Sequence, residues 1–207
     1  MLPARTIAVD GPLTRDPMQT EARINLLALV ARSAPPNASA IEPGRAGSIL
    51  ALAAASYGSR PSGDATVPTG FDPVAVALFE AIVEGAYVVA NADGVFDAEE
   101  RRTFEKVVVA ACGGTVAPQQ IAALVSDLGD QLEEDGIDRR VEIIARSVTK
   151  KDHAREILRI AALLAYVSED VSEVEREVLG KLAHQFGIEP GAVDTSLAEA
   201  RAAIERG

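Results

Sequence analysis

Apolar residues recur at helical spacing along the chain from Asp72 onward, and no segment there alternates apolar and polar residues as a strand does. Asp72 and Pro73 are typical of an N-cap and a first-turn proline, and the apolar run "VAVALFEAIVEGAYVVANA" follows them. The pattern therefore predicts an all-α fold, a compact bundle of about seven helices. The later helices are expected, to within about 2–4 residues at each end, over residues 98–112, 118–134, 139–148, 150–167, 173–186 and 190–205.

The first 70 residues form a different region, a Pro- and Ala-rich N-terminal arm, because eight of the 11 prolines lie there. The arm carries six Lys or Arg and five Asp or Glu, a balance of +1, whereas residues 71–207 carry 14 and 26, a balance of −12. Two short helices are predicted in the arm, one beginning after Asp16 and one over "SILALAAASY", residues 48–57, before Gly58. The chain is thus divided into an arm, residues 1–70, and a helical domain, residues 71–207.

Both short helices of the arm carry apolar residues, which must be buried either on the helical domain or on another chain. One interpretation is an extension that packs on the main domain. The other is a tether that attaches the protein to a protein partner, a scaffold or a second copy, while the bundle folds without it. The candidate docking residues are Ile24, Leu27, Ile49, Leu50 and Leu52.

The helical domain contains an internal repeat with a register of 75 residues. "AIVEGAYVVANADGVFDAEERRTFEKVVVAAC" aligns with "EILRIAALLAYVSEDVSEVEREVLGKLAHQFG", so that Ala86 meets Ala161 and Glu100 meets Glu175. The repeat predicts a duplicated helix–turn–helix unit with a trailing helix. A pseudo-twofold relation between the copies would bring the two turns into one packed unit.

The first of these turns, in "NADGVFDAEERR", has a structural interpretation. Asp97 is placed to cap the next helix, and Glu100 is placed to reach back and complete a capping box. Ser172 and Glu175 occupy the same positions in the second turn. Gly94 allows the positive φ angle with which a helix commonly ends.

The acidic residues of the turns also permit a second interpretation, a cation site. If Gly94 takes the sixth position of an EF-hand loop, the first position falls on Val89, which has no oxygen ligand, so an EF-hand is not expected. A looser Ca²⁺ or Mg²⁺ site stays open beside capping alone. Its candidate ligands are Asp93, Asp97 and Glu100, with Glu169, Asp170 and Glu175 as helpers.

The motif in "ANADGVFDAEERRTF" resembles the signature of TerB-like domains: Ala-Asp-Gly, an apolar residue, a capping residue and a Glu three positions later. "GIDRRVEIIARSVTKKDHAREILRIAALLAYVSEDVSEVEREVLGKLAHQFGI" is similar to the second half of that family, so the resemblance covers residues 72–207. It implies an all-helical, non-enzymatic module, of the kind named for bacterial tellurite resistance, in stress-linked or metal-ion-linked assemblies. The family often has a second Asp-Gly where this chain has Ser168 and Glu169, which implies weak cation binding or none.

Composition narrows the functional classes further. A formal charge of −11 and a pI of ≈ 4.7 argue against a nucleic-acid or anionic-membrane partner, because those need clustered Lys and Arg. The most lipid-like stretch, residues 48–57, is shorter than the roughly 20 residues that span a bilayer, so we expect no membrane insertion and a cytoplasmic location.

Catalysis has little support in the sequence. His153 and His184 fall in predicted helices without a metal-binding spacing, and the single cysteine, Cys112, lies near a helix end. We therefore expect no enzymatic activity. The expected function is a TerB-like module, and the alternative is a structural or adaptor protein whose acidic turns only cap helices.

Overall fold

The structure, a computed structural model, describes residues 17–33, 48–59, 72–94, 96–168 and 170–206. Every regular element in these ranges is helical, which confirms the all-α fold class. The elements are α1 (Pro17–Arg32), α2 (Ile49–Gly58), α3 (Pro73–Ala90), α4 (Ala98–Ala111), α5 (Pro118–Ser147), α6 (Lys151–Leu164), the 3₁₀ helix η1 (Ala165–Ser168), α7 (Glu173–Gln185) and α8 (Ala192–Arg206).

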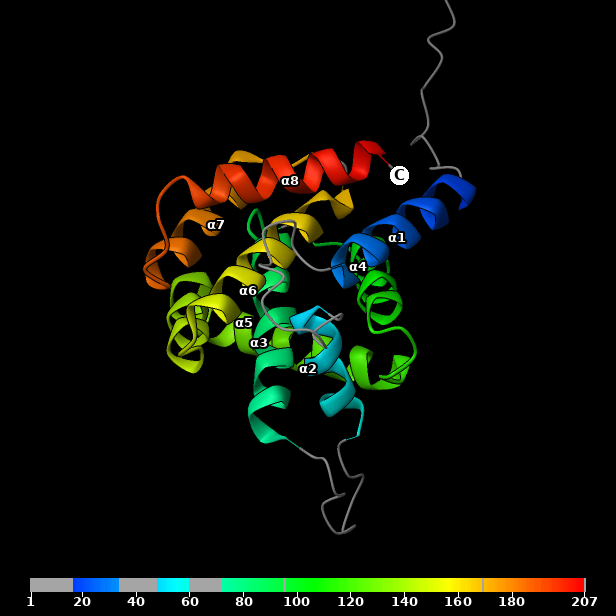
Figure 1. Ribbon diagram of the computed structural model, residues 1–207, viewed down its shortest axis with the longest axis horizontal. Coiled ribbons are helices and arrows are strands. Elements are labelled where there is room, and N and C mark those ends of the chain that lie inside the picture. The colour runs from blue at the N-terminus through cyan, green and yellow to red at the C-terminus, as the bar shows by residue number, and fades with distance from the viewer. Residues whose placement is uncertain (1–16, 34–47, 60–71, 95, 169, 207) are drawn as a thin grey trace, which may run out of the picture.

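Helix α3 runs through the middle of the bundle and is contacted by α2, α5, α6 and α7 (Figure 1). It begins at an Asp72 cap, in which Asp72 Oδ1 accepts hydrogen bonds from Val74 N at 2.9 Å and Ala75 N at 3.3 Å. From residue 81 to residue 89 every side chain is buried, so this segment has no polar face. The central position explains why apolar residues lie on all sides of α3, with Glu84 as a buried charged residue among them.

Among the described residues, α3 is the one helix long and apolar enough to cross a membrane, with a mean hydropathy of 1.7. The expectation that residues 48–57 are the most membrane-like stretch is thereby corrected, because α3 is apolar over a longer segment, whereas α2 is short, as expected. Since 61% of α3 is buried inside the bundle, its composition is that of a core helix.

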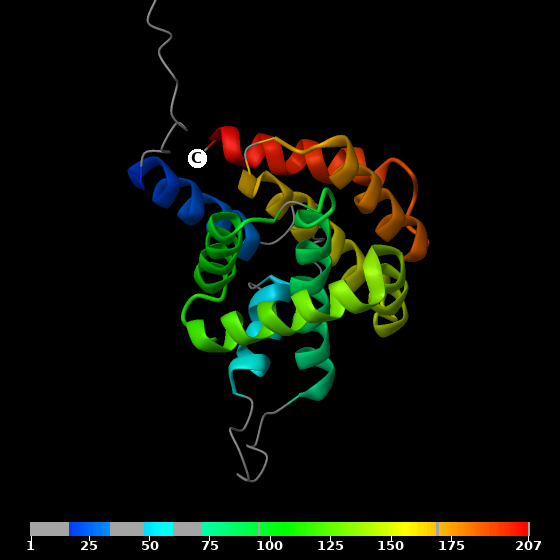
Figure 2. The same ribbon diagram turned by 180° about the vertical axis from the view of Figure 1, so that it is seen from behind.

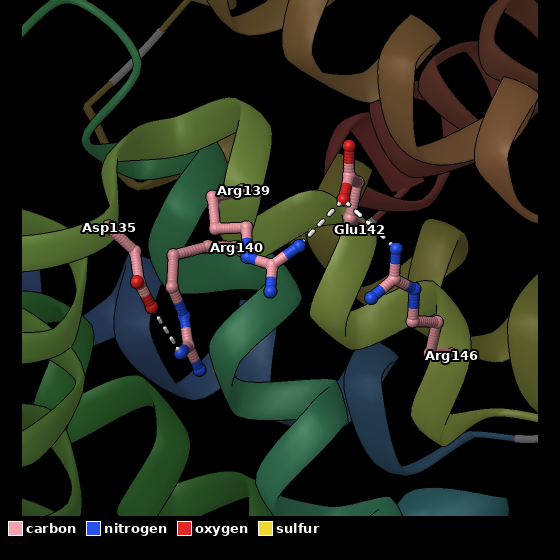
Figure 3. Close-up of polar contacts among 5 residues, drawn as sticks. All are labelled: Asp135, Arg139, Arg140, Glu142 and Arg146. Carbon is pink, nitrogen blue, oxygen red and sulfur yellow. Dashed lines mark hydrogen bonds and ion pairs between the residues drawn. The ribbon is translucent and has the colours of Figure 1, made fainter.

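Helix α5 consists of two helical segments that meet at a kink at Gly136, whose φ of 73° and ψ of 166° are not helical. The kink lies between the two helices predicted over residues 118–134 and 139–148 and agrees with that prediction. Figure 3 shows Arg140 directed at Asp135 across the kink. Arg140 Nη1 donates to Asp135 Oδ2 at 3.0 Å. Arg140 Nε also donates to the buried Oε1 of Glu84 on α3 at 2.6 Å. The ion pairs thus tie the kink to the central helix.

The charged network around the kink has a buried part and an exposed part. Burial raises the pKa of Glu84 above its usual value, although the charge of Arg140 acts in the opposite direction. Arg139 and Arg146 instead converge on Glu142 at the surface, at 3.0 and 3.3 Å (Figure 3). Exposed pairs of this kind contribute about 0–1 kcal/mol. The buried pair is the one that joins the kink to α3.

The two arm helices belong to the same core as the helical domain. Helix α1 packs on α4, and α2 packs on α3 (Figures 1 and 2). Ile24, Leu27 and Leu50 are only 3%, 1% and 3% exposed. These three side chains are therefore covered by their own chain and are not available to a partner, which corrects the docking prediction for them. Ile49 is half-buried, and Leu52, at 55%, is exposed.

The repeat of 75 residues relates α3, the first turn and α4 to α6, η1, the second turn and α7. Helices are found in both predicted positions, although α6 ends at Leu164 and continues to Ser168 as the 3₁₀ helix η1. The superposition of the two units stays a prediction.

Candidate functional site

The first turn is closed by its backbone and by the cap of α4. Gly94 has a φ of 74°, and its N–H donates to Asn91 O at 3.0 Å. Asp97 Oδ1 accepts from Glu99 N at 2.7 Å and Glu100 N at 2.9 Å, while Glu100 Oε2 accepts from Asp97 N at 3.2 Å. This is the complete capping box that the sequence predicts.

Three aromatic rings hold the first turn against its helices. Tyr87, Phe96 and Phe104 meet edge to face, with centroid distances of 5.5, 5.8 and 6.0 Å between the three pairs. Phe96 lies in the turn itself, whereas its partners lie on α3 and α4. Sequence reasoning missed this cluster; its signal was that three of the eight aromatic residues fall within one copy of the repeat.

The second turn has the same kind of cap. Ser172 Oγ accepts from Glu175 N at 3.2 Å, and Glu175 Oε2 accepts from Ser172 N at 2.7 Å. Just before it, Tyr166 O in η1 accepts two hydrogen bonds from the guanidinium of Arg23 on α1. The second turn is therefore also held by the arm, which sequence reasoning did not predict.

The two turns meet at one pocket with a volume of ≈ 160 Å³. Four of its residues are carboxylates, two from each turn, above an apolar floor supplied by the ends of α3 and α6. The lining residues are Ala90, Asp93, Phe96, Glu100, Leu164, Val167, Asp170, Ser172 and Glu175. We refer to this pocket as the acidic pocket.

The structure thus gathers most of the candidate ligands and separates others. Asp97 is not among the lining residues and acts as the cap of α4. Asp170 lines the pocket but is largely exposed, 3.8 Å from the guanidinium of Arg201. Glu169 lies outside the described residues.

Glu175 carries the clearest electrostatic signature in the acidic pocket. Its side chain is buried, and burial is the largest cause that raises its pKa above the usual value. The nearby charges of Asp93 and Glu100 raise it further, whereas hydrogen bonds from Ser172 act in the opposite direction. The first turn is therefore close enough to repel a negative charge on the second.

The donors of the acidic pocket are carboxylate oxygens, the ligands that Ca²⁺ and Mg²⁺ prefer. As placed in the structure, no three His, Cys, Asp or Glu side chains of the described residues are grouped closely enough to hold a metal ion. The donor chemistry therefore suits a hard cation, but the side chains would have to rearrange to coordinate one.

The other titratable candidates do not form a second site. Cys112 is buried at the end of α4, and burial raises the pKa of its thiol to about 12, so the reactive thiolate is scarce at neutral pH. His153 lies in the first turn of α6, and His184 is exposed at the end of α7. Neither lines the acidic pocket.

The sequence model of the family described as tellurite resistance protein TerB matches residues 79–198. The match covers more than half of the chain, and it includes both turns and all of α4 to α7. The chain therefore belongs to the TerB family, and this confirms the resemblance drawn from the sequence. Searches of curated proteins and of solved structures found no match.

Proposed function

We propose that the protein is a non-enzymatic TerB module in a tellurite-resistance-type or stress-linked assembly, and that its acidic pocket binds Ca²⁺ or Mg²⁺ weakly. The observation that carries the proposal is the convergence of both turns on one pocket. Asp93 and Glu100 come from the first turn, and Asp170 and Glu175 come from the second. A cation site formed by both copies would give the repeat a binding function, which the capping boxes alone do not provide.

Capping and cation binding are compatible in this arrangement. Glu100 and Glu175 each use Oε2 for the cap, while an ionised carboxylate has two oxygens and about four lone-pair positions. Asp93 has no part in either capping box. A divalent cation among these groups would also offset the mutual repulsion that raises the pKa of Glu175.

The affinity should be low, because the side chains must first rearrange. We expect a dissociation constant of about 10⁻⁴–10⁻³ M, the range of the weakest calcium-binding modules. The departure of the second turn from the Asp-Gly pattern supports the same expectation, since Ser168 stands where the family often has Asp.

Calorimetry on the full chain tests the proposal. Ca²⁺ and Mg²⁺ are titrated into the wild type, into Asp93→Asn and into Asp127→Asn, which removes the same charge from an exposed site on α5 outside the acidic pocket. We expect binding in the wild type and in Asp127→Asn, and affinity weaker by about tenfold in Asp93→Asn. Absence of binding in all three, or equal affinities, would leave only the capping role.

The alternative function, a structural or adaptor protein attached to a partner or a second copy, is favoured by a different observation. Both capping boxes are complete, so the acidic turns already have a structural purpose. The outward faces of the arm helices expose Met18 and Leu29 on α1 and Leu52 on α2. Light scattering on the wild type and on Leu29→Lys would detect self-association through this face, and a monomer in both would exclude it. Both proposals include a cytoplasmic location for the protein.

A further inference from the structure

The arm reaches the second turn through Arg23. Its Nε and Nη2 atoms donate to Tyr166 O at 3.1 and 2.5 Å, across 143 residues of sequence. Carbonyl groups in the last turn of a helix lack intrahelical donors, and a carbonyl oxygen has two lone pairs to offer. Arg23 therefore satisfies a helix-end carbonyl that belongs to the second copy of the repeat.

The next residue, Val167, lies between the arm and the acidic pocket. Its side chain lines the acidic pocket and also a small cavity of ≈ 40 Å³ beside α1, which Arg23, Ile24 and Leu27 help to enclose. The preceding residue, Tyr166, also contacts α8, because its Oη donates to Leu197 O at 3.4 Å. A displacement of α1 would therefore move the wall of the acidic pocket.

The first turn has internal aromatic packing in addition to the contact of α1 with α4. In the register of 75, its rings Tyr87, Phe96 and Phe104 correspond to Ala162, Val171 and Leu179. The second turn lacks the aromatic packing that fixes the first, and the contact from α1 takes its place.

We propose that Arg23 is a positioning residue for the second turn, and that docking of α1 is linked to occupancy of the acidic pocket. The planar guanidinium makes a directed, two-donor contact that a lysine ammonium does not reproduce. Without this contact η1 keeps its buried side chains and the hydrogen bond of Tyr166 to Leu197 O, but it loses its hydrogen bonds to α1. The linkage rests on the proposed cation function, whereas the positioning role does not.

Arg159→Lys provides a matched control for Arg23→Lys. Arg159 on α6 donates to Val30 O at 3.3 Å and Ala31 O at 3.0 Å, so it holds the opposite end of α1. Both substitutions keep the positive charge and loosen α1. Arg159 also donates to the buried Glu156 of its own helix at 2.8 and 2.9 Å, whereas Arg23 donates to η1. Arg23→Met is a second variant, which keeps an aliphatic stem and donates no hydrogen bond.

The first measurement is amide hydrogen exchange of the full chain without added cation. Exchange over residues 165–175 should quicken by about tenfold in Arg23→Lys, which is the size expected for loss of a charge-assisted hydrogen bond. The increase should be similar in Arg23→Met. It should stay near the wild-type rate in Arg159→Lys. Equal exchange in the Arg23 and Arg159 variants, or no change in either, would overturn the positioning role.

The second measurement is calorimetry with Ca²⁺. Arg23→Lys should bind about tenfold more weakly than the wild type, as expected when a group that orients ligands is lost, whereas Arg159→Lys should bind equally well. By reciprocity, saturating Ca²⁺ should slow exchange in α1. If the wild type binds Ca²⁺ and Arg23→Lys binds it equally, the linkage is wrong. If the wild type binds no cation, the proposed function fails, and the exchange experiment still decides the role of Arg23.

Discussion

The first and second turns of the repeat carry matching capping boxes but rest on different supports. Asp97 with Glu100 and Ser172 with Glu175 make the same reciprocal pair of hydrogen bonds. The first turn is then fixed by rings from its own two helices, and the second by Arg23 of the arm. A cap is encoded within four residues, so each copy can supply its own. The contacts that hold each turn in place come from tertiary packing. They differ between the two copies because the copies have different neighbours.

This difference has an energetic consequence. Aromatic pairs contribute about 0.5–1.5 kcal/mol each beyond the burial of their area, and all the rings belong to one helix–turn–helix unit. The second turn depends instead on a helix that lies far away in the sequence. Loss of the Arg23 contact should therefore affect the second turn before it affects the first.

The largest effect should come from removing the arm. A chain of residues 71–207 lacks the side chains of Ile24, Leu27 and Leu50, and each large-to-small loss of this kind costs about 2–5 kcal/mol. Their sum approaches the whole stability of a typical domain, about 5–15 kcal/mol. Thermal unfolding followed by circular dichroism should show no cooperative transition for 71–207.

A chain that lacks only residues 1–16 is the control for this truncation and should unfold cooperatively, as the full chain does. A sharp transition of 71–207 within a few degrees of the full chain would show instead that the arm is separable. In that case the second turn would not depend on α1.

A smaller effect is expected from the aromatic cluster. Phe104 is fully buried, and Phe104→Ala should lower the free energy of unfolding by about 3–5 kcal/mol in urea titrations. Phe104→Leu introduces the residue found at the equivalent position of the second copy and removes two ring contacts. It should lower the free energy of unfolding by about 1–3 kcal/mol. Hydrogen exchange should quicken over residues 91–97 and stay unchanged over residues 165–175. Equal quickening at both turns would mean that they are supported together.

The caps should respond alike in the two turns. Asp97→Ala and Ser172→Ala each remove a side-chain acceptor at a helix N-terminus and should each cost about 0.5–2 kcal/mol in urea titrations. Asp97→Ser exchanges one good cap for another and should be close to neutral. If Asp97→Ser proved as costly as Asp97→Ala, the charge of Asp97 would have a role beyond the cap.

Local features of this chain could be read from its sequence, and remote contacts could not. Both capping boxes and the helical periodicity depend on residues within one or two helical turns of each other, so the amino-acid sequence is enough to predict them. The apolar face of α1 could also be predicted. The surface against which Ile24 and Leu27 pack could not be predicted from these residues. The contact of Arg23 with Tyr166 O joins residues 143 positions apart, and no local spacing indicates it. The kink of α5 was expected as a break, but its ion pair to Glu84 needed the packed structure.

The smallest predicted effect concerns the pH dependence of stability that arises from Glu175. The pKa of Glu175 is raised by burial and by the charges of Asp93 and Glu100, so the folded state binds a proton there more readily than the unfolded state. The stability that this group contributes is thus fully present below its unfolded pKa, 4.5, and is lost as pH rises through the folded pKa. Glu175→Gln keeps an acceptor for the cap but does not titrate. Urea titrations at a series of pH values should therefore give a flatter pH profile for Glu175→Gln than for the wild type. Glu173→Gln, which removes an exposed charge from the same helical turn, should keep the wild-type slope. Profiles of equal slope for wild type and Glu175→Gln would show that the pKa of Glu175 is not raised in the folded state.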